Sequence, residues 1–212
     1  MKTKNQKNLF AALSFLSAFA AWTVVICFVD VENIGPLDSR VGLSAINGAV
    51  RNLFGVHMSL YTVTDWLGLV PIGFAAGFAI IGLAQWIRRG RLLNVDRSII
   101  ALGVFYLVVI AIYLLFEIAV VNYRPVLIDG RLEASYPSST TVLSISVMAT
   151  SMIQLCGRIK KELFRRCAII AISAFILFMV LGRLFSGVHW FSDIIGGILL
   201  SAGLVELYRY FK

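Results

Sequence analysis

The sequence predicts an all-α, polytopic membrane protein with six transmembrane helices, organised as one domain over residues 1–212. Hydrophobic residues make up 59% of the chain and charged residues only 14%, whereas a soluble domain carries about 25% charge. Six apolar runs are each close to the roughly 20 residues that one membrane crossing requires. Apolar and polar residues do not alternate along them as in a transmembrane β-barrel. The composition therefore excludes a soluble globular enzyme, a disordered chain and a nucleic-acid-binding module.

The six apolar runs give the expected helices in chain order. They are residues 9–29, 60–87, 98–121, 141–158, 167–185 and 189–210. The first run is longer than the core of a signal peptide, so we expect an uncleaved membrane anchor. In the long connection that follows, apolar residues recur at roughly helical spacing from Val41 to Leu53. This pattern predicts a short amphipathic helix on the membrane surface.

The basic residues predict how these helices are oriented. If the N-terminus is cytoplasmic, 14 of the 19 Lys and Arg residues lie on the cytoplasmic side, in residues 2–7, 88–97, 158–166 and 209–212. Only three acidic residues accompany them, which gives +11 inside and −3 outside. Because positively charged loops stay in the cytoplasm, we expect both termini there and the protein in the plasma membrane. The net charge of +8 thus reflects topology rather than a polyanionic partner.

Three segments at the outer ends of the third to sixth helices gather polar residues that are costly near a membrane. Residues 122–125 follow the third helix, and their Arg-Pro pair projects Arg124 into the outer loop. Residues 136–141 precede the fourth helix, where their hydroxyl groups suit either an ordinary N-cap or a bound anion. Residues 182–193 contain Arg183 and give the most specific signal.

In this third segment, His189 and Asp193 are four residues apart and share one face if the segment is helical. The carboxylate can then hold one imidazole nitrogen and leave the other free as a nucleophile or base. A turn at Ser186-Gly187 would bring Arg183 back beside His189. A merely structural His-Asp hydrogen bond is the alternative, and the arginine at this spacing argues against it.

These motifs resemble the type 2 phosphatidic acid phosphatase (PAP2) superfamily of integral membrane lipid phosphatases, whose soluble relatives are the vanadium haloperoxidases. The family pattern is Lys-x6-Arg-Pro, Pro-Ser-Gly-His and Ser-Arg-x5-His-x3-Asp. The corresponding segments here are Glu117-x6-Arg124-Pro125, Pro137-Ser138-Ser139-Thr140 and Gly182-Arg183-x5-His189-x3-Asp193. The resemblance covers residues 117–193 in its motifs and implies a PAP2-like helical bundle.

The resemblance also implies the roles of the site residues. His189 would attack phosphorus and form a phosphohistidine, and Asp193 would orient it. The phosphoryl oxygens would be bound by side chains and by backbone N–H groups near the fourth helix. The residues that this implies are Arg124, Arg183, Ser138 and Ser139. No metal or cofactor is implied, because the arginines supply the positive charge.

Thr140 stands where the family has the histidine that protonates the leaving group. A threonine cannot act as an acid near neutral pH, and general acid catalysis is typically worth about 10²–10⁴ in rate. A phosphate leaving group, with a second pKa near ~6, needs this help far less than a lipid alkoxide does. The departure therefore favours diphosphate lipids, such as polyprenyl diphosphates, as substrates.

Glu117 stands where the family has a phosphate-binding lysine. It could pair with Arg124 two helical turns later if the helix persists that far, act as a substitute acid, or be purely structural. His57, the only other histidine, is a weaker candidate for the missing acid.

The sequence therefore predicts a lipid phosphatase or diphosphatase that acts on a lipid phosphate at the outer membrane face. Two alternatives stay open because two of the three motifs are altered. One is a lipid phosphotransferase, in which an alcohol accepts the phosphoryl group. The other is a catalytically impaired protein that binds or moves phospholipids.

Overall fold

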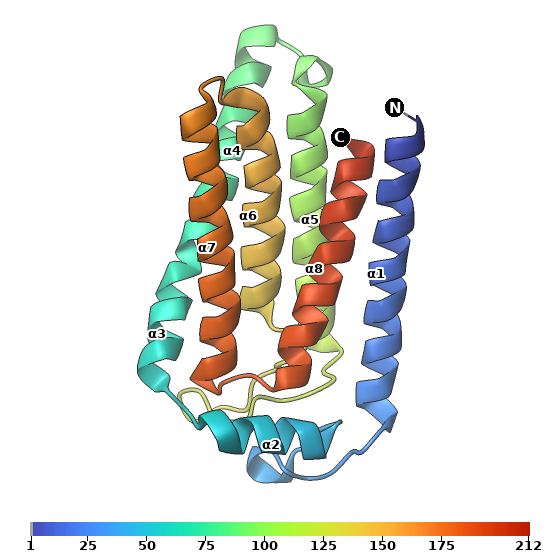
Figure 1. Ribbon diagram of the computed structural model, residues 1–212, viewed down its shortest axis with the longest axis vertical. Coiled ribbons are helices and arrows are strands. Elements are labelled where there is room, and N and C mark those ends of the chain that lie inside the picture. Colours follow the sequence, from blue (N-terminus) through green and yellow to red (C-terminus); the bar gives the residue numbers. More distant parts are fainter. Residues whose placement is uncertain (1) are drawn as a thin grey trace.

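The computed structural model describes residues 2–212, with side chains from residue 5 onward, and forms a bundle of long helices (Figure 1). The side chains of Lys2 and Lys4, counted above as cytoplasmic, lie outside this described part. The helices are α1 (Lys2–Phe28), α2 (Ser44–Phe54), α3 (Met58–Leu67), α4 (Leu69–Arg89), α5 (Arg97–Ile118), α6 (Ser139–Arg158), α7 (Glu162–Ser186) and α8 (Phe191–Phe211). Within residues 2–212, six segments are long and apolar enough to span a membrane, and α3 with α4 forms the second. The predicted fold class is confirmed.

The second span is divided at Gly68, which the hydropathy pattern did not predict. Pro71 lies in the first turn of α4 and has no N–H to donate to the carbonyl of Leu67. Its ring also crowds that carbonyl, so a continuous helix through Leu67 is unfavourable. The span therefore consists of two helices, and α3 packs against α7.

The centre of the bundle is formed by α6 and α8. Of their most apolar segments, 56% and 61% of residues are buried, against 11% for α1. Small residues allow the close packing: a Cβ atom at Gly196 would lie 2.4 Å from the ring of Tyr136, and one at Gly197 would lie 3.0 Å from Thr141 Cγ2. Small residues at helix contacts are typical of membrane bundles.

The segments that carry the predicted motifs meet at one end of the bundle, which we call the site end. It consists of residues 29–57, 119–138 and 187–190. Figure 1 shows α2 lying across this end, as expected for the predicted amphipathic helix, and both chain termini at the opposite end. Asp30 fixes the start of α2, because its carboxylate accepts hydrogen bonds from Ser44 Oγ (2.9 Å) and Ala45 N (2.8 Å).

One predicted boundary affects the site directly. The sixth helix was expected to begin at His189, but α8 begins at Phe191, so the expected helical face shared by His189 and Asp193 is wrong. The reason is local capping: the carboxylate of Asp193 accepts a hydrogen bond of 3.0 Å from the backbone N–H of Trp190. This bond satisfies a donor that has no partner within the helix and sets the helix start after Trp190.

Candidate active site

His189 lies in the short connection between α7 and α8. The chain turns at Gly187, which has a positive φ of 66°. A Cβ atom at Gly187 would lie only 2.0 Å from the carbonyl oxygen of Gly55, so the connection packs directly on the backbone that precedes α3. This packing buries His189, which is 4% exposed.

Ser135 connects His189 to Asp193. Its Oγ lies 3.0 Å from His189 Nδ1 and donates a hydrogen bond of 2.5 Å to Asp193 Oδ2. The expected contact between carboxylate and imidazole therefore runs through a serine hydroxyl. A hydroxyl has one proton, and here Asp193 accepts it, so Nδ1 must be protonated to bond with Ser135. In this tautomer, Nε2 keeps its lone pair.

Asp193 is held by further donors on its other oxygen. Its Oδ1 accepts hydrogen bonds from Asn122 Nδ2 at 3.1 Å and from Ser192 Oγ at 3.4 Å. Ser192 is in turn fixed by Asn47 of α2, whose Nδ2 donates to Ser192 Oγ (2.9 Å) and whose Oδ1 accepts from Ser192 N (3.0 Å). This buried polar network holds the carboxylate in one orientation and ties α2 to the site.

Arg183 lies in the last turn of α7 and is 1% exposed. Its Nη2 donates to Asp65 Oδ1 at 2.8 Å and to Thr140 Oγ1 at 2.6 Å. The guanidinium group also lies 4.9 Å from the centre of the Tyr61 ring, within the range of a cation–π interaction. Side chains from α3 and α6 thus position an arginine that α7 carries.

Arg124 reaches the same place from the loop between α5 and α6. Its backbone N–H donates to the carbonyl of Glu133 at 3.0 Å, so the segments around these two residues lie side by side within the loop. Its Nε lies 3.1 Å from Glu133 Oε2, which forms an ion pair. Its guanidinium lies 5.9 Å from the Tyr61 ring, so Tyr61 contacts both arginines.

Several buried nitrogen atoms of this site have no hydrogen-bond partner among the described residues. They are Nη1 of Arg124, Nε and Nη1 of Arg183, and Nε2 of His189. The guanidinium nitrogens in this set are donors, and a buried donor without a partner costs about 1–3 kcal/mol. They therefore indicate a ligand that accepts hydrogen bonds, whereas Nε2 of His189 faces it with a lone pair. The guanidinium donors are cationic, which fits a phosphoryl group.

The protonation state of His189 fits a nucleophile. Burial lowers its pKa well below the ordinary value of 6.5, and the positive charges of Arg124 and Arg183 lower the pKa further. His189 is therefore neutral at pH 7, with Nε2 free to attack an electrophile.

The start of α6 lies beside these groups. Ser138, predicted to bind phosphate, is fully buried: its N–H donates to the carbonyl of Asp193 at 3.1 Å and its Oγ accepts from Thr141 Oγ1 at 3.0 Å. Ser139 and Thr140 begin the helix, and the Thr140 hydroxyl accepts the bond from Arg183 described above. The N–H groups of this first turn have no partner within the helix and favour an anion.

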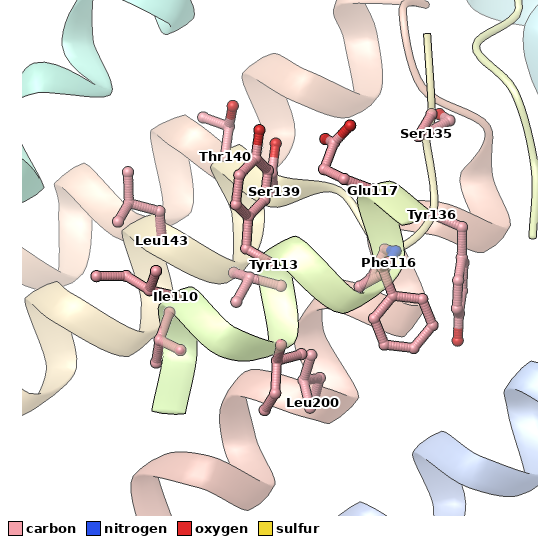
Figure 2. Close-up of a pocket in the computed structure, with 15 residues that line it drawn as sticks. Ile110, Tyr113, Phe116, Glu117, Ser135, Tyr136, Ser139, Thr140, Leu143 and Leu200 are labelled. Carbon is pink, nitrogen blue, oxygen red and sulfur yellow. The ribbon is translucent and has the colours of Figure 1, made fainter. Parts of the chain in front are cut away.

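A cavity of about 280 Å³ between α5, α6 and α8 reaches this polar cluster. Its apolar lining includes Val109, Ile110, Ile112, Phe116, Leu143 and Leu200, and its polar lining includes Tyr113, Glu117, Ser135, Ser139 and Thr140. Figure 2 shows the oxygen atoms of Glu117, Ser139 and Thr140 on one side of the cavity and Leu200 on the other. His189 and Arg183 do not line the cavity themselves, but each contacts a residue that does: Ser135 contacts His189, and Thr140 contacts Arg183.

The predicted pair of Glu117 and Arg124 is wrong. The helix α5 ends at Ile118, so the two helical turns that would have aligned them are not formed, and Arg124 pairs with Glu133. The Glu117 side chain instead lines the polar end of the cavity. His57 lies outside this cluster: it is exposed, and its Nε2 lies 2.8 Å from the carbonyl oxygen of Phe54.

Comparison with known proteins identifies the family. A family model described as the PAP2 superfamily matches residues 71–212. The chain belongs to the PAP2 superfamily. Among solved structures, the chain is similar to one described as the crystal structure of the first transmembrane PAP2 type phosphatidylglycerolphosphate phosphatase from Bacillus subtilis, with 16% identity, 94% of each chain covered and a TM-score of 0.58. At this identity the similarity shows a common fold. A search of curated proteins finds no match.

Membership of the PAP2 superfamily supports a lipid phosphatase at the level of the family, and the matched region contains every predicted site residue from Glu117 to Asp193. Sequence reasoning missed Ser135, Asn122 and Asp65 as parts of the site. Asp65 did carry a signal, since an acidic residue inside an apolar run is costly unless it has a partner. Ser135 carried none, because only the fold brings this loop serine between His189 and Asp193.

Proposed function

We propose that this protein is a lipid phosphatase or diphosphatase that acts through a phosphohistidine on His189. The observation that supports the proposal is the position of a neutral histidine, with an unpartnered Nε2, beside the buried Arg183 and the partly buried Arg124. The arginines hold the phosphoryl group, and the apolar cavity between α5, α6 and α8 receives the lipid chain.

The reaction takes two steps. In the first, the lone pair of Nε2 forms a bond to phosphorus while the bond between phosphorus and the leaving oxygen breaks. The guanidinium groups of Arg124 and Arg183 stabilise the charge on the remaining phosphoryl oxygens. Asp193 offsets, through Ser135, the positive charge that develops on the ring. In the second step, water attacks phosphorus, phosphate leaves, and Nε2 regains its lone pair.

The preferred substrate is a diphosphate lipid. Thr140 accepts a hydrogen bond from Arg183 and helps to position it, but its hydroxyl is far too weak an acid to protonate an alkoxide. A lipid diphosphate attacked at its terminal phosphorus releases a lipid monophosphate, which leaves without protonation because its second pKa is near ~6. A lipid monophosphate would have to release an alkoxide.

We place the site on the outer face of the plasma membrane. The supporting observation is the distribution of charge, because the connections at the end opposite the site carry most of the lysines and arginines.

The test is phosphate release by the purified protein from a polyprenyl monophosphate and the diphosphate of the same chain. We expect faster release from the diphosphate, loss of all release in His189→Gln, and a smaller difference between the two substrates in Thr140→His, which restores the family acid. Equal rates for both lipids in the wild type contradict the diphosphate preference. Unchanged release in His189→Gln, or binding of both lipids without release, overturns the catalytic proposal. Added acceptor alcohols that gain phosphate would identify a transferase.

A further inference from the structure

We propose that Ser135 is a positioning residue that couples Asp193 to His189 and sets the tautomer of the imidazole. The coupling is the hydrogen-bonded chain from His189 Nδ1–H to Ser135 Oγ and from Ser135 O–H to Asp193 Oδ2. The effect of Ser135 on the reaction rate rests on the proposed function of His189. The effect of Ser135 on the tautomer of His189 does not depend on that function.

This hydrogen-bonded chain is buried, and its bonds are short. Ser135, His189 and Asp193 are 3%, 4% and 0% exposed, so water does not compete for their hydrogen bonds. The two distances are 3.0 Å and 2.5 Å, and the second is at the short end for a hydroxyl that donates to a carboxylate. In a site of low effective dielectric, such charge-assisted bonds are stronger than in water.

The other contacts of Asp193 prevent a direct bond to the histidine from replacing this chain. Oδ2 accepts the N–H of Trp190 in addition to Ser135, and Oδ1 accepts Asn122 Nδ2. Turning the carboxylate toward the ring would break the bonds to Trp190 and Asn122, which are both buried. The serine hydroxyl is therefore the side-chain group that reaches Nδ1, and the backbone of Ser135 also interacts with the imidazole.

The backbone holds Ser135 in place on both sides. Its own N–H donates to the carbonyl of Asn122 at 2.9 Å, and the neighbouring Ala134 pairs with Tyr123 across the loop. On the other side, the hydroxyl of Tyr136 lies 2.7 Å from Thr23 Oγ1 of α1. The hydroxyl of Ser135 is thus pre-organised, as expected of a group that positions a nucleophile.

The hydrogen-bonded chain also compensates the charge that develops on the imidazole during the reaction. When Nε2 bonds to phosphorus, the ring gains positive charge, and the Nδ1 proton can move to Ser135 Oγ while the hydroxyl proton moves to Asp193. No proton is gained or lost by the three residues together. Without the hydroxyl, the charge of Asp193 has no bonded route to the ring.

The tautomer can be measured without any assay of activity, because the chain contains only two histidines. In the His57→Gln variant, His189 is the single histidine, and ¹⁵N NMR of labelled protein in micelles reports which ring nitrogen carries the proton. We expect a protonated Nδ1 and an unprotonated Nε2, and a loss of this single tautomer when Ser135→Ala is added. Protonation at Nε2 in the His57→Gln parent, or an unchanged spectrum in Ser135→Ala, overturns the proposal.

Kinetics provide the second test, through a pair of variants with the same shape. Ser135→Thr keeps the hydroxyl, whereas Ser135→Val replaces it by a methyl group. We expect kcat of Ser135→Val to fall about 10–100-fold below that of Ser135→Thr, the range seen when a group that orients a histidine is removed, with similar KM values. Equal losses in both variants contradict the proposal, because crowding alone would then explain them.

Ser201→Ala serves as the control for deleting a buried hydroxyl. Ser201 is fully buried in α8, and among the described residues its hydroxyl bonds backbone carbonyls, those of Gly197 and Val142. We expect the kcat of Ser201→Ala to stay within about twofold of the wild-type value. If neither Ser135→Thr nor Ser135→Val folds, the NMR comparison alone decides. If the protein releases no phosphate from any lipid, the proposed function fails while the tautomer measurement still tests the role of Ser135.

Discussion

At the scale of single residues, the site separates satisfied polar groups from unsatisfied ones. Ser135 and Asp193 have hydrogen-bond partners at short distance, whereas His189 Nε2 and two nitrogens of Arg183 have none among the described residues. Both kinds are buried, so the difference does not come from exposure to water. The satisfied groups hold the imidazole at its Nδ1 side. The unsatisfied nitrogens are available to a bound phosphoryl group.

The titration of His189 tests this arrangement. Its pKa lies well below 6.5 because of burial and the charges of Arg124 and Arg183. The unfolded chain therefore takes up a proton near pH 6.5 while the folded chain does not, so stability falls as the pH drops below 6.5. NMR titration of the His57→Gln variant should find His189 neutral at pH 6.5. Arg124→Gln should raise its pKa, and a wild-type midpoint at or above 6.5 would contradict this account.

The sequence predicted those site residues whose spacing is itself informative. His189, Asp193 and Arg183 were found because they lie within one short segment, and Arg124 because it precedes a proline at a helix end. Ser135 could not be found in this way. Its role depends on a loop that folds back 54 residues away in sequence from His189, and local patterns do not encode such contacts.

At the scale of elements, two helix starts meet at Asp193. Its carboxylate caps α8 through the Trp190 N–H, and its backbone carbonyl accepts the N–H of Ser138, which precedes α6. The carboxylate of Asp193 thus occupies the start of α8, whereas the start of α6 lies beside Arg183, which donates to Thr140 Oγ1. Because a helix N-terminus carries partial positive charge, the start of α6 favours an anion in addition to the guanidinium group.

The turn at Gly187 is the element on which the position of His189 depends. A Cβ atom there would lie 2.0 Å from the Gly55 carbonyl oxygen, and the positive φ disfavours any side chain. Gly187→Ala should lower the free energy of unfolding by about 1–3 kcal/mol, as overpacking does, and reduce activity. Gly130→Ala is the matched control, because Gly130 also has a positive φ but nothing lies within 4 Å of its Cβ position. Thermal unfolding in detergent measures the stability of both variants. Equal losses of stability would show that the positive φ, and not the contact with Gly55, causes the effect.

The boundaries of the helices could be predicted only where apolar residues define them. The third helix was expected to reach residue 121 but ends at Ile118, and the sixth was expected two residues too early. In both places hydrogen bonds hold the backbone in another conformation: the carboxylate of Asp193 accepts the N–H of Trp190, and the backbone carbonyl of Asn122 accepts the N–H of Ser135. Hydropathy records the solvent preference of side chains and not these bonds.

At the scale of the whole molecule, hydropathy was sufficient for the fold because the lipid requires apolar helices regardless of detail. It said less about the arrangement of the helices. The two most buried segments, α6 and α8, carry serine, threonine and glycine on their packed faces, since a surface that contacts protein need not be apolar. The central position of these helices follows from this composition, and α1 with its larger exposed apolar surface lies outside them.

The orientation of the whole bundle is the last testable consequence. The connections opposite the site carry most of the positive charge, so the site end should face outward. The three native cysteines are unpaired and can be replaced by serine before single cysteines are introduced. In intact cells, a membrane-impermeant thiol reagent should label Arg131→Cys at the site end, whereas Lys160→Cys at the opposite end should react only after permeabilisation; both positions are exposed. The reverse pattern would place the arginines and His189 in the cytoplasm, where the substrate would have to come from the inner leaflet.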